Sequence, residues 1–91
     1  MELRVNTKQM QDSGEEIMRI SEEVGKEIEL FYAKLNHLVA DGVWQGISAN
    51  KYYQKVLPYK EELLAFNREL RKYGDYLVRN SEKLEGLVKK V

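Results

Sequence analysis

The sequence predicts an all-α fold in which two long helices are joined by one short turn and fold back as an antiparallel two-helix hairpin. Three observations lead to this prediction. Apolar residues recur at helical spacing in the first half of the chain, they recur every seven residues in the second half, and a segment with two glycines separates the halves. The 91 residues are enough for a single domain, residues 1–91.

The first helix is expected over residues 7–40. Its apolar stripe advances in steps of mostly three and four residues, as one face of a helix does. Asn6, followed three residues later by Gln9, predicts a capping box at its start, with Val5 as a hydrophobic staple. The stripe consists of Met10, Ile17, Ile20, Val24, Ile28, Phe31, Leu35 and Leu38.

Small residues also occur inside this helix. Gly14, Ser21 and Gly25 form a strip that would let another backbone approach closely. The alternative is that the glycines are tolerated on the surface of a long helix, where each costs up to about 1 kcal/mol relative to alanine. The sequence leaves both interpretations open.

A turn is expected at residues 41–46, where Gly42 and Gly46 lie within five residues of each other after a periodic helix. So short a connection makes the two helices antiparallel. Trp44 is expected to cover the end of the hairpin with its ring while its indole nitrogen meets a free helix-end carbonyl.

The second helix is expected from about residue 47 to residue 91. Pro58 falls inside it, so we expect a kink near Gln54–Pro58 or a restart of the helix there. The pattern is a heptad repeat, which predicts that these residues face the other helix. Its a positions are Ala49, Val56, Leu63, Leu70, Leu77, Leu84 and Val91, and its d positions are Tyr52, Tyr59, Phe66, Tyr73, Asn80 and Leu87.

Further apolar residues flank these stripes, and two helices alone bury only one stripe each. We therefore expect pairing into a four-helix bundle dimer, either with a second copy or with a related hairpin. The alternative is that the flanking tyrosines merely lie along the surface. The residues expected at the dimer interface are Tyr32, Val39, Tyr53, Leu57, Leu64 and Tyr76.

The composition argues against several function classes. The chain has no cysteine and a single histidine, His37, and its neighbouring glutamates point about 100° apart on a helix. We therefore expect no catalytic site, no metal site, no cofactor and no enzymatic activity. The net charge is zero, and acids interrupt the basic residues of the second half, so nucleic-acid binding is not expected. Membrane insertion is not expected either, because no apolar run is long enough to span a bilayer.

The halves carry opposite charge. Residues 1–43 contain five Lys and Arg against nine Asp and Glu, a balance of −4, and residues 44–91 contain ten against six, a balance of +4. Oppositely charged helices attract each other when they lie side by side, which favours a hairpin.

The turn carries the segment Trp44-Gln45-Gly46, followed six residues after Gly46 by the aromatic Tyr52. With the chain length and the two-helix layout, this resembles the WXG family of small type VII (ESX/Ess) secretion proteins over essentially the full length. The resemblance implies a hairpin that pairs with itself or with a paralogous WXG-like hairpin. It also implies a secreted effector, an apparatus component or a carrier, with a secretion ATPase or a larger cargo toxin as further partners.

The resemblance also implies export without a cleavable signal peptide, with a cytoplasmic stage before export. The family often carries an export signal, Tyr-x-x-x-Asp/Glu, and this chain departs from it. The closest segment runs from Tyr76 to Asn80 and ends in a neutral amide. We therefore expect the signal to come from a partner chain. The alternative function is a cytoplasmic coiled-coil adaptor or chaperone for a larger helical protein.

Overall fold

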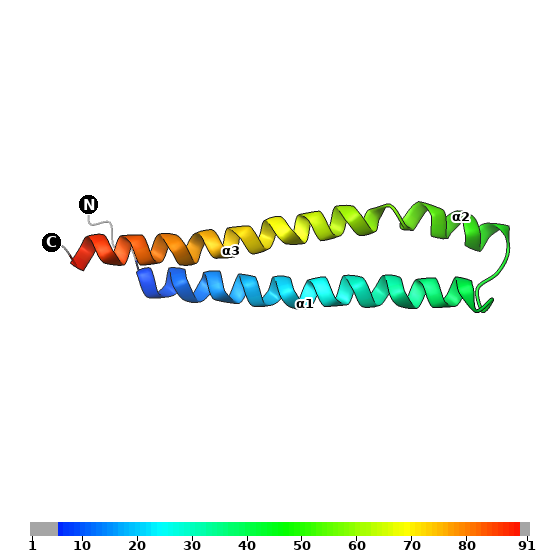
Figure 1. The fold of residues 1–91 in the computed structure, drawn as a ribbon, viewed down its shortest axis with the longest axis horizontal. Coiled ribbons are helices and arrows are strands. Elements are labelled where there is room, and N and C mark those ends of the chain that lie inside the picture. Colours follow the sequence, from blue (N-terminus) through cyan, green and yellow to red (C-terminus); the bar gives the residue numbers. More distant parts are fainter. Residues whose placement is uncertain (1–5, 90–91) are drawn as a thin grey trace. The chain divides into compact units, whose positions relative to one another are not determined.

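The computed structural model describes residues 6–89, which form three α-helices and the turns between them. In chain order these are α1 at Thr7–Ala40, α2 at Ile47–Val56 and α3 at Tyr59–Lys89 (Figure 1). No strand occurs within residues 6–89. The all-α helical hairpin predicted from the sequence is confirmed, with its second arm divided into α2 and α3.

The chain divides into two compact units, which are described separately. Unit 1 combines Met1–Glu22 with Arg68–Val91, and unit 2 is Glu23–Asn67. Each unit pairs a segment of α1 with an antiparallel segment of the second arm.

At the start of α1, Asn6 makes the hydrogen bond expected of the first residue of the predicted capping box. The side-chain Oδ1 of Asn6 accepts a hydrogen bond of 2.9 Å from the backbone amide of Gln9, and its carbonyl accepts one of 3.1 Å from Met10. Asn6 therefore satisfies an amide that the first turn of a helix leaves free. The expected staple residue Val5 and the last heptad residue Val91 lie outside the described residues.

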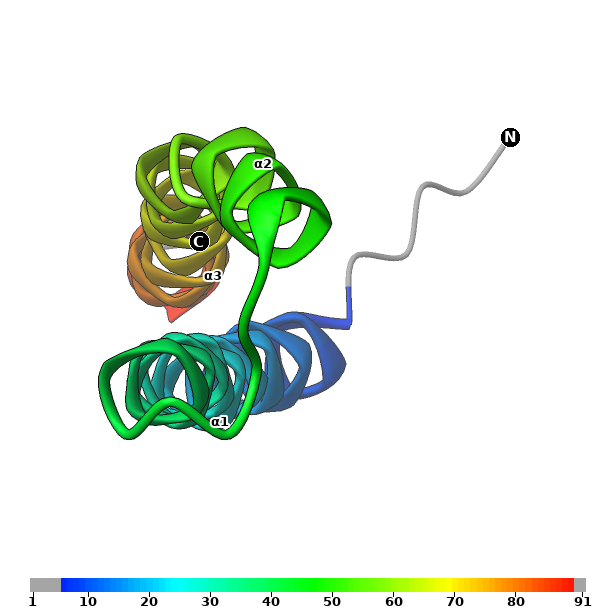
Figure 2. The ribbon, with the colours of Figure 1, turned by 90° about the vertical axis from the view of Figure 1, so that its right-hand side faces the viewer.

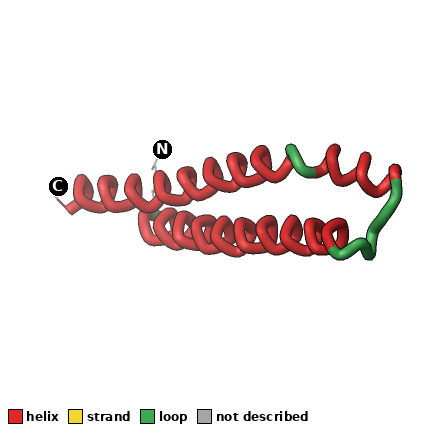
Figure 3. The backbone as a smooth tube through the Cα atoms, turned by 45° about the vertical axis from the view of Figure 1, so that its right-hand side comes forward, coloured by secondary structure: helices red, strands yellow, loops and turns green. Residues whose placement is uncertain are grey.

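The connection between α1 and α2 is a six-residue turn, seen end-on in Figure 2 and as the longer green segment in Figure 3. Gly42 ends α1 with a positive φ of 72°, and its amide donates to the carbonyl of Val39. Gly46 begins α2 with a φ of 109°. Residues with a Cβ resist both angles, so the two glycines determine where the turn starts and ends.

The break between α2 and α3 falls at Leu57–Pro58, as the proline predicts. In a continuous helix the amide of Lys60 would donate to the carbonyl of Val56. Here it donates to the carbonyl of Leu57 instead, at 3.2 Å, which leaves the Val56 carbonyl free. The hydroxyl of Tyr32, a residue only 5% exposed, donates to that carbonyl at 2.9 Å. A side chain of α1 thus supplies the hydrogen bond that the last carbonyl of α2 would otherwise lack.

Replacing Tyr32 with phenylalanine is expected to lower the free energy of unfolding by about 1 kcal/mol, because the part-buried carbonyl of Val56 loses the hydroxyl that donates to it. Urea unfolding followed by circular dichroism measures the change. The control is Tyr52→Phe, at a residue 58% exposed, which is expected to shift stability by less than about 0.5 kcal/mol. Equal effects of the two substitutions would contradict this role of the Tyr32 hydroxyl.

In unit 1 the helices meet through small residues. A Cβ built on Gly14 would lie 2.6 Å from the carbonyl oxygen of Gly74, and one built on Gly74 would lie 2.7 Å from the carbonyl oxygen of Gly14. Ser21 and Ser81 of the same unit are also buried, with exposed fractions of 2% and 1%. The close approach of the two backbones confirms the small-residue interpretation for Gly14.

In unit 2 larger side chains fill the contact. Tyr32, Leu35 and Ala49 are its buried apolar residues, and the buried Asn67 lies beside Gly25. A Cβ on Gly25 would come within 3.0 Å of the Asn67 side-chain nitrogen. Gly25 therefore makes room for the amide of Asn67.

The inward sides of the helices differ from the predicted stripes by a rotation of about one residue. On α1 the predicted Ile28 and Leu35 do lie inward, together with Gly14 and Ser21. The predicted Phe31 is instead 55% exposed, and the next residue, Tyr32, is buried. On α3 the most buried positions are Asn67, Gly74 and Ser81, each one position after a predicted d residue. The prediction that the d positions face α1 is wrong. Helices that approach closely put their small residues at the centre of the contact and push large ones to its edge.

Candidate interaction surface

The apolar residues displaced from the contact gather on one side of unit 2. On α1, Val24, Phe31 and Leu38 follow one another at intervals of seven, so they share a helix side. On α3 the corresponding side chains lie three or four residues apart. The groove face, as we name it, comprises Val24, Phe31, Leu38, Tyr59, Leu63 and Phe66, which are 39%, 55%, 42%, 55%, 46% and 72% exposed.

A groove of about 500 Å³ runs between α1 and α3 on this face. Its floor is apolar and two carboxylates stand at its α1 edge. Single exposed apolar residues are ordinary on a protein surface, whereas a contiguous set around a groove marks an interaction site. The groove is lined by Glu23, Val24, Glu27, Ile28, Phe31, Tyr32 and Leu63.

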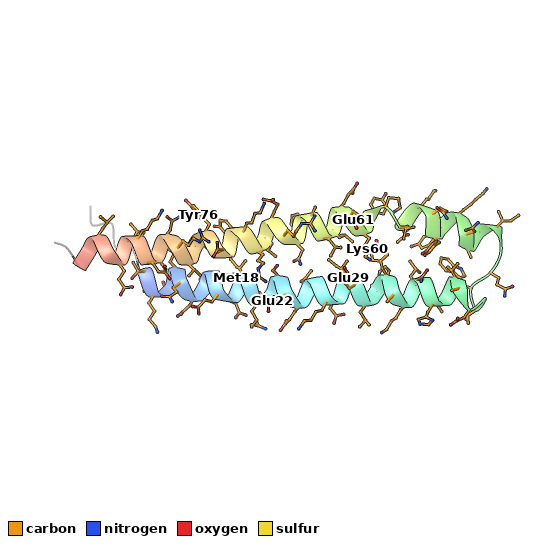
Figure 4. The ribbon with its side chains drawn as sticks, in the orientation of Figure 1. Met18, Glu22, Glu29, Lys60, Glu61 and Tyr76 are labelled. Carbon is orange, nitrogen blue, oxygen red and sulfur yellow. The ribbon has the colours of Figure 1, made fainter. Side chains whose placement is uncertain are left out.

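On the opposite side of unit 2, polar side chains of α1 contact those of α2 and α3. Lys60 pairs with Glu29 at 3.2 Å, and the hydroxyl of Tyr53 donates to Asn36 Oδ1 at 3.1 Å. Figure 4 shows Glu29 and Lys60 directed toward each other from α1 and α3. Glu29 lies two residues before Phe31, and residues two apart on a helix point about 200° apart. Unit 2 therefore has one polar side and one apolar side.

Unit 1 shows a similar ion pair between Arg71 and Glu22, at 3.0 Å. Its exposed large apolar residues include Ile20, Tyr73 and Tyr76. The rings of Tyr73 and Tyr76 stack with centroids 6.4 Å apart. Tyr76 is 60% exposed and Asn80 is half-buried on the same helix, α3. Their role as an export-signal region stays a prediction.

The predicted interface residues mostly lie elsewhere than on the groove face. The prediction for Tyr32 is wrong, because the rotation of α1 buries its ring and its hydroxyl bonds to Val56. Val39, Tyr53 and Leu64 are half-buried within unit 2. Leu57 is 40% exposed beside Tyr53 and Lys60, on the polar side. An interface role for these residues and for the exposed Tyr76 stays a prediction.

The turn motif is tied to α2 by an aromatic contact. The rings of Trp44 and Tyr52 meet edge to face, with centroids 5.7 Å apart. The carbonyl of Leu38, near the end of α1, accepts a hydrogen bond of 2.9 Å from the backbone amide of Trp44. The structure thus joins Trp44 to Leu38 through the main chain, where the sequence suggested the indole nitrogen. Val43 and Ile47 beside it are 75% and 77% exposed.

Several charged side chains form pairs on the surface. Within residues 6–89 there is no group of three or more His, Cys, Asp or Glu side chains placed to hold a metal ion. A hydrogen bond from Arg19 lowers the pKa of the exposed Glu16 carboxyl, as expected for a surface pair. His37 contacts Asp41 at 3.1 Å, and both side chains are exposed.

None of the helices, over the residues described, has the length and apolar character needed to cross a bilayer.

Sequence reasoning missed the groove face because it placed these residues inside the hairpin. The signal that locates the inner contact is a second heptad, made of small and polar residues. Gly14 and Ser21 are seven residues apart, as are Asn67, Gly74 and Ser81. Assigning these positions to the inside would have left Phe31 and Phe66 outside.

Searches of protein-family models, curated proteins and solved structures found no match to this chain.

Proposed function

We propose that this protein is a non-enzymatic interaction module, which binds another helical hairpin through the groove face of unit 2. The main support for this proposal is the difference between the two sides of unit 2. An ion pair and a hydrogen bond join the two arms on one side. On the other side six large apolar residues are exposed, and three of them, Val24, Phe31 and Leu63, line a groove. Two further helices laid on this face would bury the exposed rings and give a four-helix bundle.

We further propose that the protein acts in a bacterial type VII secretion system, as an exported effector, an apparatus component or a carrier of a larger cargo. The support is the resemblance of Trp44-Gln45-Gly46 and its setting to the WXG family. Gly46 has the positive φ that glycine accepts at low cost, and Trp44 packs on Tyr52. A motif held in this way presents Val43 and Ile47 to solvent at the turn, where a secretion component or cargo protein would contact it.

Export provides the test of the secretion role. Deleting the secretion ATPase of the host is expected to remove the protein from the culture medium while its amount in the cells persists or rises. Quantitative immunoblotting of cells and medium measures both pools. A protein exported by the general secretory route serves as the control and should be unaffected. An unchanged extracellular amount of this protein would contradict the secretion role.

A cytoplasmic coiled-coil adaptor or chaperone is the second candidate function. One observation favours it: the residue four positions after Tyr76 is the neutral Asn80 and not an acid. Affinity capture of the tagged protein from cells and from medium separates the two candidates. Recovery only from cells, bound to a larger helical protein, would support the adaptor.

A further inference from the structure

We propose that the outer side of α2 is a second binding surface, which takes an acidic helix of a partner protein. This surface, which we name the outer strip, consists of Ile47, Lys51 and Lys55, and all three are exposed. None of them belongs to the groove face. The inference rests on the proposed contact of a secretion component or cargo protein near the turn, because it states which side chains that partner presents.

The outer strip lies on the side of α2 that is turned away from α1. Its three residues follow one another at intervals of four, so they share one side of the helix. The side that faces α1 carries the buried Ala49 and, four residues later, Tyr53, whose hydroxyl donates to Asn36 of α1. Lys51 comes two residues after Ala49 and therefore points about 200° away from it. The hairpin itself thus leaves the outer strip uncovered.

The charge of this surface is positive and uncompensated. Among the helices of the described residues, α2 is the one that contains basic residues and no acid. Residues 44–60 contain three lysines and no Asp or Glu, and one of these lysines, Lys60, pairs with Glu29. Neither Lys51 nor Lys55 forms an ion pair with an acid in the described part of the chain. Two free positive charges therefore stand on one side of α2.

The same two lysines line one hollow of about 500 Å³. Tyr52 adds an aromatic ring to this hollow, and Trp44 packs edge to face on that ring. Ser48 and Gln54 add polar groups. A side chain that enters the hollow meets two ammonium groups beside an aromatic ring. A carboxylate at the end of a short aliphatic stem suits this combination, because it accepts charge-assisted hydrogen bonds and packs its methylenes on the ring.

The spacing of the outer strip indicates a helical partner. Ile47 and Lys55 lie eight residues apart, about 12 Å along the helix axis. A second helix laid alongside presents its own side chains at the same intervals, so two carboxylates four residues apart face the two lysines. An apolar side chain one turn further covers Ile47, which is 77% exposed. In antiparallel packing the partner sequence reads Asp/Glu-x-x-x-Asp/Glu-x-x-x-apolar.

Two other negatively charged occupants fit the outer strip less well. Attraction to an anionic membrane takes a cluster of about four to eight basic residues, whereas this surface has two. Nucleic-acid binding also depends on several phosphate contacts, and Glu61 and Glu62 follow shortly after the strip in the chain. An acidic helix requires only the two charge pairs and the one apolar contact that the strip offers.

Disulfide tethering tests the chemistry of the partner, because the natural chain has no cysteine. The full-length Ser48→Cys variant is equilibrated in a glutathione buffer with two alanine-based helical peptides, each with one cysteine. The acidic peptide carries two Glu four residues apart and a leucine four residues later, and the basic peptide carries Lys in place of Glu. Mass spectrometry is expected to find at least about tenfold more mixed disulfide with the acidic peptide at low salt, since two ion pairs replace two like-charge contacts.

A third peptide separates the geometry of the strip from its charge. It has the composition of the acidic peptide, but its two Glu are two residues apart and point to opposite sides of the helix. We expect at least about threefold less mixed disulfide from it, because only one carboxylate at a time reaches a lysine. Equal yields from the two acidic peptides would overturn the helical pairing, and equal yields from all three would overturn the acidic partner.

Removal of the two lysines locates the site. Lys51→Gln with Lys55→Gln, made in the Ser48→Cys variant, is expected to abolish the preference for the acidic peptide. The matched control is Arg79→Gln with Lys83→Gln, two basic residues at the same spacing on α3, where Arg79 already pairs with Asp75. This control should leave the preference unchanged, and circular dichroism checks that both variants fold. A preference that survives the loss of both lysines would contradict the outer strip as the site.

Vesicle binding and export separate the remaining outcomes. Equal tethering of all three peptides, together with sedimentation of the natural protein on phosphatidylglycerol vesicles, would overturn the acidic helix in favour of a membrane surface. Export that depends on the secretion ATPase, without any peptide preference, would overturn the outer strip and leave the secretion role standing. A clear preference for the acidic peptide, in a protein whose extracellular amount does not depend on the ATPase, would support the outer strip and overturn the secretion role.

Discussion

Replacing Phe31 with aspartate is expected to weaken self-association of the purified protein by at least about a hundredfold, which corresponds to about 3 kcal/mol. Phe31 lines the groove between α1 and α3, so a bound hairpin would lose the contact with its ring and meet a carboxylate in an apolar contact. The side chain is 55% exposed in the single chain. The hairpin itself should therefore fold, with circular dichroism as the check. Sedimentation equilibrium measures the dissociation constant.

The matched control is Ala33→Asp, which places the same charge two residues away on the same helix but off the groove face. Ala33 lines a hollow on the other side of unit 2 together with Asn36 and Lys60. This variant is expected to dimerise with an affinity within about threefold of that of the natural protein, because exposed surface changes usually cost less than about 0.5 kcal/mol. A dimer retained by Phe31→Asp, or lost equally in both variants, would show that the groove face is not the contact.

Much of the fold could be predicted because its signals are local. Asn6 and Gln9 specify the start of α1, the glycines at 42 and 46 bound the turn, and Pro58 interrupts the second arm. Each acts through its own backbone chemistry, a capping oxygen, a positive φ or a missing amide proton. No knowledge of the partner helix is needed to locate them.

Local signals of this kind do not predict which side of each helix faces the other helix. The a and d residues form a strong heptad, and a regular heptad is normally assigned to the nearest partner helix. Here Leu70, Leu77 and Leu84 are half-buried, whereas Tyr59, Phe66 and Tyr73 remain exposed. A helix that packs against two neighbours has two adjacent rows of apolar residues. Hydrophobicity alone does not show which row faces the other helix of the same hairpin. The close approach of Gly14 and Gly74 decides it, since large side chains do not fit between two backbones in contact.

Replacing Gly74 with leucine is expected to lower the free energy of unfolding by about 3 kcal/mol, at the upper end of the usual cost of overpacking. A Cβ at this position would meet the Gly14 carbonyl oxygen at 2.7 Å and the Met18 side chain at 2.8 Å. The oxygen belongs to the backbone, so the helices of unit 1 must separate to admit a side chain. Gly74→Ala is expected to show a smaller loss, because its helix propensity returns about 1 kcal/mol.

Gly86 offers the matched control on the same helix, because nothing lies within 4 Å of a Cβ built there. Gly86→Ala and Gly86→Leu are both expected to stabilise the protein, by up to about 1 kcal/mol for alanine, since only the helix propensity changes. Urea unfolding of the four variants should therefore give opposite signs at the two glycines. Stabilisation by Gly74→Leu would show that the backbones do not touch at Gly14 and Gly74, and that the large residues face inward after all. The exposure of Tyr73 in unit 1 would then lose its physical cause, because the close backbone contact at the neighbouring Gly74 is what leaves no room for a large side chain inside.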